Sequence, residues 1–388
     1  MSALEPATGP LAGLRVVEFA GLAPVTVVGM VLSDLGADVV RVDRLHHAAD
    51  TDANDLRRGR RSICLDLKHD DGLAVATRLI ERSDLLIEAY RPGVMERLGL
   101  GPDVARELNP GLIYGRLTGW GQTGPFAQAA GHDITYLALT GALHPIGPAD
   151  RPPTPPLNYV ADMGGGAMLL LLGLLAALHE RQTSGTGQVV DAAMVDGVTI
   201  LAGSLLRSRA DGNWRPERGT NVLDGGAPFY GSYECRDGGF LAVGAIEPEF
   251  YAAFVAGLGF RLDDLPPQHD HEQWPATRQR FAARIAQRTR ADWEQTFDGT
   301  DACVAAILTL DEAPQHPQIA GRACYTDVDG RWQPSPAPKF ARTPGAIRGP
   351  APRRGAHTRE LLAELGWEGP AGDALVRAGA AHDDGGPR

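Results

Sequence analysis

The chain is poor in cysteine and lacks the short motifs that mark the commonest nucleotide and metal enzymes. Its four cysteines, Cys64, Cys235, Cys303 and Cys324, lie far apart and form no CxxC pair, so no zinc or disulfide framework is predicted and a reducing cytoplasm fits best. The first β-α turn, residues 21–24, is not a GxGxxG turn, and no Walker, HExxH or EF-hand sequence is present. Nicotinamide enzymes and P-loop hydrolases are therefore disfavoured, and neither a metal nor a separate cofactor is expected.

The chain also lacks an excess of positive charge. With 37 Lys and Arg against 48 Asp and Glu, its net charge is -11, which argues against a nucleic-acid partner and against general attraction to anionic membranes. Residues 1–14 lack the charged start and apolar core of a secretory signal. The most apolar run, Ala167–Leu178, is shorter than the about 20 residues that span a bilayer, so we predict a buried core helix and no membrane partner.

Predicted strands and helices alternate through the first part of the chain. Strands are predicted at residues 14–20, 37–43, 62–67, 84–90 and 112–118, with helices at 25–35 and 70–81 and a short one after Pro92. Such alternation builds a parallel sheet with helices on both faces, and ligands then bind beyond the carboxyl ends of the strands.

The second part of the chain has a different texture. A long helix is predicted at Asp162–Glu180, a strand at 188–192, a helix at 194–209, and a hairpin around Arg236–Gly239 followed by helices. The predicted fold class is α/β, with a large domain built on a Rossmann-like parallel sheet and a smaller α/β domain. The large domain is placed at residues 1–200 and 325–368, the small one at 219–310, linkers at 201–218 and 311–324, and a disordered tail at 369–388.

Arginines gather in one stretch, Arg57-Arg58-Gly59-Arg60-Arg61, of an otherwise acidic chain. Further cations stand at or just after predicted strand ends: Arg41, Arg44, Lys68, Arg91 and Arg97. Guanidinium groups that converge at one sheet edge suit a ligand with several phosphates. A solvated loop whose arginines pair with nearby carboxylates is an equally good interpretation.

Three acidic or imidazole side chains stand where proton chemistry is plausible. His132 lies between Gly131 and a helical run, and imidazole suits proton abstraction near neutral pH, although a single histidine more often packs or caps. Glu247 precedes Pro248 at a helix start, where the ordinary interpretation is a favourable first-turn charge.

Asp162 precedes three glycines, Gly164–Gly166, at the predicted start of the long helix. An ordinary Asp N-cap is the simplest interpretation. The glycines add another, because their exposed amides and the helix dipole can hold an oxyanion. The same dipole should lower the pKa of Asp162 and weaken it as a base, unless burial offsets that effect.

The sequence resembles the alpha-methylacyl-CoA racemases, a branch of the family III CoA-transferase superfamily, from about Gly9 to Gly349. The resemblance rests on these segments: GLRVVEFAGLAP, LGADVVRVDR, LDLK, IEAYRPGVMERLGL, TGWGQTGPFAQAAGHDITY, PLNYVADMGGG, GTGQVVDAAMVDG, LDGGAPFYGSYEC and VGAIEPEFY. Departures from the family pattern are mild: Tyr159 and Ala161 vary the residues around Asp162, and the family explains no role for the C-terminal tail.

The resemblance implies a set of functional residues. His132 matches the histidine of GHDINY, Asp162 the aspartate of LNLxxDxGGG, and Glu247 the glutamate taken to pair with that histidine. The implied coenzyme A contacts, some through backbone atoms, fall on Arg44, Leu65, Ala89, Tyr90, Arg91, Arg97, Gly131 and Tyr136. It also implies an interlocked homodimer in which Glu247 reaches His132 across the subunit boundary.

The implied reaction interconverts (2R)- and (2S)-2-methylacyl-CoA thioesters. One of His132 and Asp162 removes the α-proton, the other returns a proton to the opposite face, and no cofactor beyond the substrate's coenzyme A is needed. One alternative is a CoA-transferase of the same superfamily that uses Asp162 as a nucleophile through an aspartyl-CoA thioester; such enzymes lack the histidine of GHDITY. A second alternative, a non-catalytic acyl-CoA-binding protein, has no need of the three side chains.

Overall fold

The computed structural model describes residues 8–21, 23–45 and 55–383 and divides the chain into two compact units. The large unit comprises residues 1–140, 157–201 and 323–388. The small unit comprises residues 141–156 and 202–322, and so includes a segment, 141–156, that the sequence assigned to the large domain.

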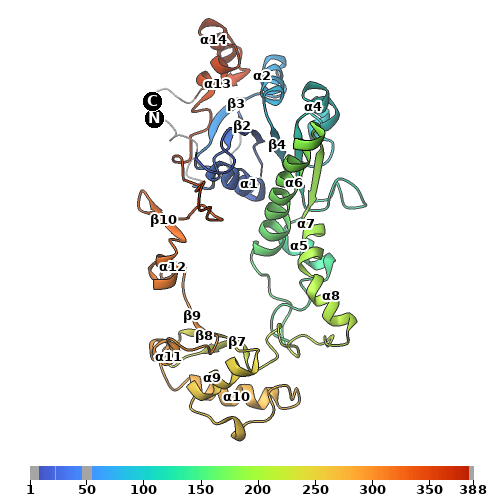
Figure 1. Ribbon diagram of the computed structural model, residues 1–388. Helices are drawn as coiled ribbons and strands as arrows, with labels where there is room; N and C mark the ends of the chain where they lie inside the picture. Colours follow the sequence, from blue (N-terminus) through green and yellow to red (C-terminus); the bar gives the residue numbers. More distant parts are fainter. Residues whose placement is uncertain (1–7, 22, 46–54, 384–388) are drawn as a thin grey trace. The chain divides into compact units, whose positions relative to one another are not determined.

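The large unit is built on a seven-stranded sheet with the order β12-β3-β2-β1-β4-β5-β6 (Figure 1). Its strands are β1 Arg15–Phe19, β2 Asp38–Arg44, β3 Arg61–Leu65, β4 Leu85–Glu88, β5 Ile113–Thr118, β6 Val189–Ala193 and β12 Ala381–His382. All neighbouring pairs are parallel except β12 and β3. The predicted Rossmann-like sheet is therefore confirmed, and its strand order reverses between β1 and β4.

The sheet is covered by helices, only some of which lie at positions that the alternation predicts. They are α1 Ala23–Asp34, α2 Asp70–Glu81, α3 Val94–Arg97, α4 Pro102–Leu108, α5 Asp133–Thr140, α6 Leu169–Ser184, α7 Met194–Leu201, α13 Thr358–Glu364 and α14 Pro370–Arg377. A short 3-10 turn, η1 Asp55–Arg57, precedes β3, and a hairpin of β10 Tyr325–Val328 and β11 Arg331–Pro334 precedes the C-terminal helices. Apolar side chains spaced three and four apart explain α2, whose Val75, Ala76, Leu79 and Ile80 are buried.

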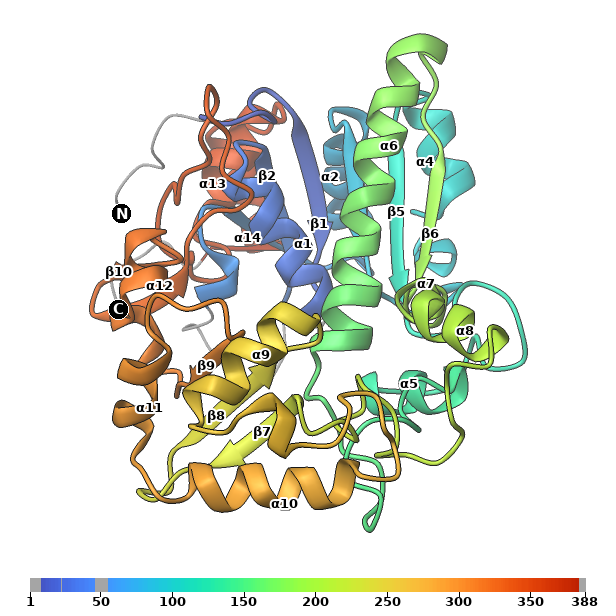
Figure 2. The ribbon, with the colours of Figure 1, turned by 60° about the horizontal axis from the view of Figure 1, so that its bottom comes forward.

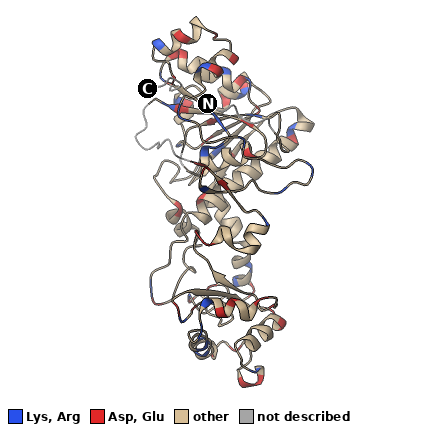
Figure 3. Cartoon of the chain, turned by 90° about the vertical axis from the view of Figure 1, so that its left-hand side faces the viewer, with Lys and Arg blue, Asp and Glu red and all other residues tan. Residues whose placement is uncertain are grey.

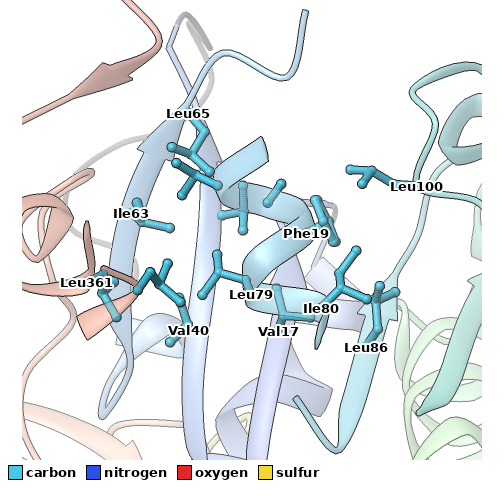
Figure 4. Close-up of a cluster of buried hydrophobic side chains, with 14 of the residues drawn as sticks. Val17, Phe19, Val40, Ile63, Leu65, Leu79, Ile80, Leu86, Leu100 and Leu361 are labelled. Atoms are coloured by element: carbon cyan, nitrogen blue, oxygen red, sulfur yellow. The ribbon is translucent and has the colours of Figure 1, made fainter. Parts of the chain in front are cut away.

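One hydrophobic core joins α2 and α13 to the sheet (Figure 4). Val17 and Val40, from adjacent strands, belong to the same buried cluster as Leu79, Ile80 and Leu361. Each such side chain stabilises the fold by about 1.5–3 kcal/mol relative to an exposed one. This packing fixes the sheet, and the sheet fixes the loops at its carboxyl edge.

The C-terminal tail, predicted to be disordered from residue 369, is ordered as far as residue 383. α14 occupies residues 370–377, and Ala381 and His382 of β12 pair with Leu65 and Cys64 of β3. The prediction was wrong because Leu375 and Ala380, in a segment of small and polar residues, are buried in the core of the large unit. Residues 384–388 lie outside the described part of the chain.

The small unit is an α/β body with its own aromatic core. Its antiparallel sheet, β7 Tyr230–Glu234, β8 Phe240–Gly244 and β9 Val304–Ile307, includes the hairpin predicted around Arg236–Gly239. Its helical segments are α8 Gly203–Ala210, α9 Pro248–Gly257, η3 Leu262–Asp264, α10 Trp274–Ile285, α11 Arg290–Phe297, η4 Ala313–Gln315 and α12 Pro317–Gly321. Phe229, Phe254, Phe281 and Trp293 are buried together between sheet and helices.

A long helical segment, Tyr159–Ser184, is by length and composition the one described segment that could cross a membrane. It consists of the π-helix η2 Tyr159–Met168 and of α6, which packs along β5 and β6 (Figure 2). The predicted buried helix is only half buried, because Leu172 is 64% exposed and Leu175 is 41% exposed.

Basic and acidic residues are intermixed along the chain (Figure 3).

Candidate active site

A pocket of about 450 Å³ lies in the large unit at the carboxyl ends of β1, β4 and β5. Its wall is formed by the segments that follow these strands: Ala23, Pro24, Ala89, Tyr90, Arg91, Pro92, Leu117, Thr118, Gly119, Trp120, Ala127, Ala129, Ala130, Gly131, His132, Tyr136, Asp162 and Met194. Because β1 and β4 flank the point where the strand order reverses, the pocket stands where open α/β sheets bind ligands. Two of the three residues predicted to carry the chemistry, His132 and Asp162, line it.

His132 directly precedes α5 and presents an exposed side chain to the pocket. Its backbone is fixed by Thr135: the His132 N–H donates to Thr135 Oγ1 at 3.0 Å, and Thr135 Oγ1 donates to the His132 carbonyl at 2.7 Å. This reciprocal arrangement stabilises the start of the helix without using the imidazole. The ring is therefore free to face a ligand.

Asp162 lies in the first turn of η2 and is partly buried, so its predicted role as the N-cap of the helix is wrong. π-Helices are rare and concentrate at functional sites. Burial and then the nearby Asp133 charge raise the pKa of Asp162, against the smaller opposing effects of an Asn158 hydrogen bond and of His132. Burial is thus the largest influence on this pKa, and Asp162 is a stronger base than an exposed aspartate.

The cap of η2 comes instead from Asp133, which sequence reasoning missed. Asp133 Oδ2 accepts hydrogen bonds from the backbone N–H groups of Ala161 and Asp162, both at 2.8 Å. The contact joins residues 28 apart in sequence, so no local pattern signals it. The only available hint was the carboxylate directly after His132.

The glycine triplet does not line the pocket as predicted. No residue of Gly164–Gly166 is among the described residues of the wall. A Cβ on Gly165 would lie 3.0 Å from Val198 N, and a Cβ on Gly197 of α7 would lie 1.9 Å from Gly165 O. The glycines therefore permit η2 and α7 to pack closely, and their absence from the pocket wall does not support the predicted oxyanion role of their amides.

The Tyr136 ring packs against Gly119, Gly131 and Trp120, next to His132. A Cβ on Gly119 would lie 2.0 Å from the Tyr136 ring, and one on Gly131 would lie 2.5 Å from it. Trp120 meets the ring edge-on with centroids 4.7 Å apart. Burial, followed by the Asp162 charge, raises the pKa of Tyr136 to about 12, so the phenol stays neutral beside the pocket.

The arginine stretch serves the fold rather than a ligand. Arg58 pairs with Asp34, Arg60 with Glu18, and Arg61 with Asp38, Glu360 and Glu364, while Arg41 pairs with Glu18 and Asp43. Arg41, Arg58 and Arg60 are buried. The interpretation in which these arginines pair with carboxylates is therefore confirmed for Arg41, Arg58, Arg60 and Arg61, and their convergence on phosphates is not.

The residues implied as coenzyme A contacts fall into two groups. Ala89, Tyr90, Arg91, Gly131 and Tyr136 line the pocket, whereas Arg44, Leu65 and Arg97 do not. The Arg44 guanidinium lies 4.7 Å from the Tyr90 ring centroid, which places it beside the pocket. Leu65 is buried in the core, so its side chain is not available to a ligand.

Glu247 belongs to the small unit. It is exposed at the N-cap position of α9, where its carbonyl accepts from Tyr251 N at 2.9 Å and its side chain makes no capping hydrogen bond. Within the described chain the carboxylate has no ion-pair or hydrogen-bond partner. The side chain is therefore available to a partner.

A larger cavity, of about 980 Å³, lies at the opposite edge of the sheet and contains none of the predicted site residues. Arg15, Asp38 and Arg61 line it at the amino ends of β1, β2 and β3. Its central cation, Arg61, is already neutralised by three carboxylates. The smaller pocket is the one that combines space with reactive groups, and none of the described residues form a metal-binding cluster.

The chain belongs to CoA-transferase family III, whose sequence pattern matches residues 11–358. It is similar to the alpha-methylacyl-CoA racemase of Mus musculus, with 49% identity over 92% of this chain and 93% of that protein. The Homo sapiens alpha-methylacyl-CoA racemase is 47% identical over 92% of this chain and 94% of its own. A succinyl-CoA–D-citramalate CoA-transferase of Chloroflexus aurantiacus is 30% identical over 92% of this chain and 94% of that protein.

Solved structures share the fold. A CaiB/BaiF family protein from Brucella suis has a TM-score of 0.79 and 25% identity, covering 92% of this chain and all 100% of that one. A hypothetical protein from Mycobacterium tuberculosis has a TM-score of 0.76 and 26% identity, covering 92% of this chain and 100% of that one.

Proposed function

We propose that this protein is an isomerase that interconverts (2R)- and (2S)-2-methylacyl-CoA thioesters. The observation that carries the proposal is that His132, directly before α5, and Asp162, in η2, line one pocket at the topological switch point. The racemase names of the relatives that are 47% and 49% identical support it. Neither a metal nor a separate cofactor is part of the proposal.

The reaction uses the two side chains as opposing bases. One removes the α-proton of the thioester, and the other returns a proton from the opposite face, which inverts the carbon. Imidazole suits this task near neutral pH, and the raised pKa of Asp162, caused mainly by burial, makes its carboxylate a better match for the α-proton. After one inversion, the group that removed the proton is protonated and the group that donated a proton is deprotonated. These are the protonation states that the reverse reaction requires.

The enolate oxygen needs a hydrogen-bond donor, and the candidate we propose is the amino end of α5, which directly follows the pocket residue His132. The backbone N–H groups of Asp133 and Ile134, at the start of that helix, have no acceptor in the described chain. By contrast, the N–H groups of Ala161 and Asp162 are already bonded to Asp133. We therefore assign oxyanion stabilisation to α5, in place of the glycine triplet.

Coenzyme A is proposed to contact Arg44, Leu65, Ala89, Tyr90, Arg91, Arg97, Gly131 and Tyr136. Three of these are exposed arginines beside the carboxyl edge of the sheet, in contrast to the paired arginines of the 57–61 stretch. Guanidinium groups recognise phosphate oxygens in two-point contacts. The acyl end then occupies the pocket, whose wall at Ala127, Ala129 and Ala130 is apolar.

The proposed assembly is an interlocked homodimer in which Glu247 of one copy orients His132 of the other and favours its imidazolium form. Two features support a second copy as partner. The Glu247 carboxylate is exposed and without a partner in the described chain. Met168 at the end of η2 and Leu172 and Leu175 on α6 form an exposed apolar stripe at helical spacing, which a protein in water normally covers. The scattered cysteines, which form no CxxC pair, favour the cytoplasm.

A CoA-transferase that uses Asp162 as nucleophile is the second candidate, because the family and relatives such as the 30% identical transferase carry that activity in their names. The two candidates separate in one experiment. A single 2-methylacyl-CoA epimer in heavy water should yield both epimers with deuterium at the α-carbon. Mass spectrometry of the quenched protein should find no coenzyme A bound to Asp162; a covalent adduct without deuterium exchange would support the transferase instead.

A further inference from the structure

Asp133 physically joins the two elements that carry the proposed bases. It is the first residue of α5, directly after His132, and its Oδ2 holds the N–H groups of Ala161 and Asp162 in η2. Asp133 is only 6% exposed. Any movement of this carboxylate therefore changes the position of Asp162 relative to His132.

The Asp133 carboxylate has a second oxygen and a negative charge, neither of which a helix cap requires. Its second oxygen, Oδ1, is buried and has no hydrogen-bond partner among the described residues. A serine or asparagine caps a helix as well as an aspartate does, without the unfavourable burial of a charge. A buried negative charge beside another carboxylate is therefore a feature that capping alone does not explain.

The groups that face Asp133 are few. His132 directly precedes α5, Tyr136 stands on α5, Asp162 stands on η2, and Arg91 follows β4 beside Tyr136. α7, which also packs against α5, carries a single ionisable side chain, the exposed Asp196. No cation bonds to Asp133 in the part of the chain that the structure describes, so its charge acts on Asp162 without a compensating ion pair.

We infer that Asp133 is a positioning residue for the proposed reaction: it fixes the Asp162 backbone against His132, and its negative charge strengthens the Asp162 carboxylate as a proton acceptor. The inference rests on the proposed function and deepens it. The Asp133 charge is the second cause, after burial, that raises the pKa of Asp162. Removing that charge while keeping an oxygen acceptor should lower the pKa of Asp162 and weaken it as a base.

The test compares Asp133→Asn with wild type in pH profiles of epimerisation. Asparagine keeps an oxygen for the two N–H groups but loses the charge. We expect kcat to fall about tenfold and the low-pH limb to move to lower pH by about half to one unit, with KM changed less than about twofold. Asp133→Ala, which also loses the cap, should lower kcat about a hundredfold and reduce Tm.

Asp191→Asn is the matched control. Asp191 is more exposed, but desolvation likewise raises its pKa and it likewise accepts a backbone N–H, from Gln122, while it does not act on Asp162. Its variant should leave the low-pH limb in place. If Asp133→Asn does not fold, Asp133→Ser restores a neutral cap and provides the same comparison. A neutral, folded Asp133 variant with wild-type kcat and an unmoved limb overturns the inference.

A carboxyl ¹³C NMR titration separates this inference from the proposed function. The Asp162 resonance is assigned by its absence in Asp162→Asn, and its midpoint should move to lower pH in Asp133→Asn. A shifted midpoint in a protein that neither exchanges nor inverts any 2-methylacyl-CoA leaves the electrostatic role of Asp133 standing and overturns the racemase proposal. An unmoved midpoint in an active enzyme overturns the role of Asp133.

Discussion

At the scale of single residues, the two proposed bases depend on different surroundings. His132 keeps an exposed imidazole because its backbone alone is used to start α5. Asp162 is partly buried, close to Asp133, and bonded to Asn158, and the balance of these effects raises its pKa above the ordinary 3.8. The low-pH limb of the activity profile should therefore lie above the range of an exposed aspartate.

Asp162→Asn should separate activity from stability. A carboxyl whose pKa is raised on folding favours the folded state below that pKa, and this contribution is lost as the pH rises through it. At pH 7.5 the neutral amide should therefore raise Tm slightly, by about 1–2 °C because water screens a half-buried group, while kcat falls about 10³-fold. Calorimetry and the epimerisation assay check both; a variant that is less stable and fully active contradicts the account.

The sequence identified the two residues proposed as bases, but not the contacts that join the elements around them. His132 and Asp162 stand in motifs that resemble a known family, so their identity was readable from GHDITY and YVADMGGG. The hydrogen bonds from Ala161 and Asp162 to Asp133 depend on how α5 and η2 meet in space, which no local pattern specifies. The glycines were misinterpreted for the same reason, since their neighbours on α7 come from a distant segment.

At the scale of elements, the close approach of η2 and α7 holds Asp162 in place. Gly165 and Gly197 face each other where a side chain on either would overlap the other helix. A π-helix has fewer favourable hydrogen bonds than an α-helix, so packing of this kind has to stabilise it. The close packing of Gly165 against Gly197 therefore helps to fix the orientation of Asp162 in η2.

Gly197→Ala should disturb this contact. Its Cβ would lie 1.9 Å from the Gly165 carbonyl oxygen, so the helices must separate. We expect the free energy of unfolding to fall by about 2–3 kcal/mol and Tm by about 5–10 °C, with a lower kcat. Gly203→Ala, whose Cβ would meet nothing within 4 Å, serves as the control and should behave as wild type in denaturant unfolding. Equal stability of the two variants would contradict the proposed role of the Gly165–Gly197 packing.

Most strands and helices followed from periodicity, and the exceptions share a cause. The bounds of α2 are those predicted, because its apolar residues recur at helical spacing in a segment with clear ends. β12 has two residues and exists through its pairing with β3, and α14 is ordered by burial of Leu375. Short segments stabilised by tertiary contacts carry too little local pattern to be predicted.

At the scale of the whole molecule, the proposed dimer makes a distinctive prediction about complementation. Co-expression of His132→Ala and Glu247→Ala chains places one intact His132 and one intact Glu247 in different copies. If the two residues meet across subunits, each mixed dimer contains one complete site. Activity should then return to about a quarter of wild type, since half the dimers are mixed and half their sites are complete.

Separate purification of the two variants provides the control, because each alone should be nearly inactive. Analytical ultracentrifugation should show dimers in every sample. If the mixed preparation stays as inactive as its parents although mixed dimers are detected by differential tagging, Glu247 does not serve the partner's His132, and that part of the proposal is wrong.

The central claim is that His132 and Asp162 act on opposite faces of one α-carbon. The most direct measurement incubates each pure 2-methylacyl-CoA epimer in heavy water with His132→Asn and, separately, with Asp162→Asn, and follows deuterium incorporation and inversion. Each variant should exchange the α-proton of only one epimer, a different one for the two variants, without inversion. Exchange of both epimers by either variant, or inversion that survives both substitutions, would contradict the account.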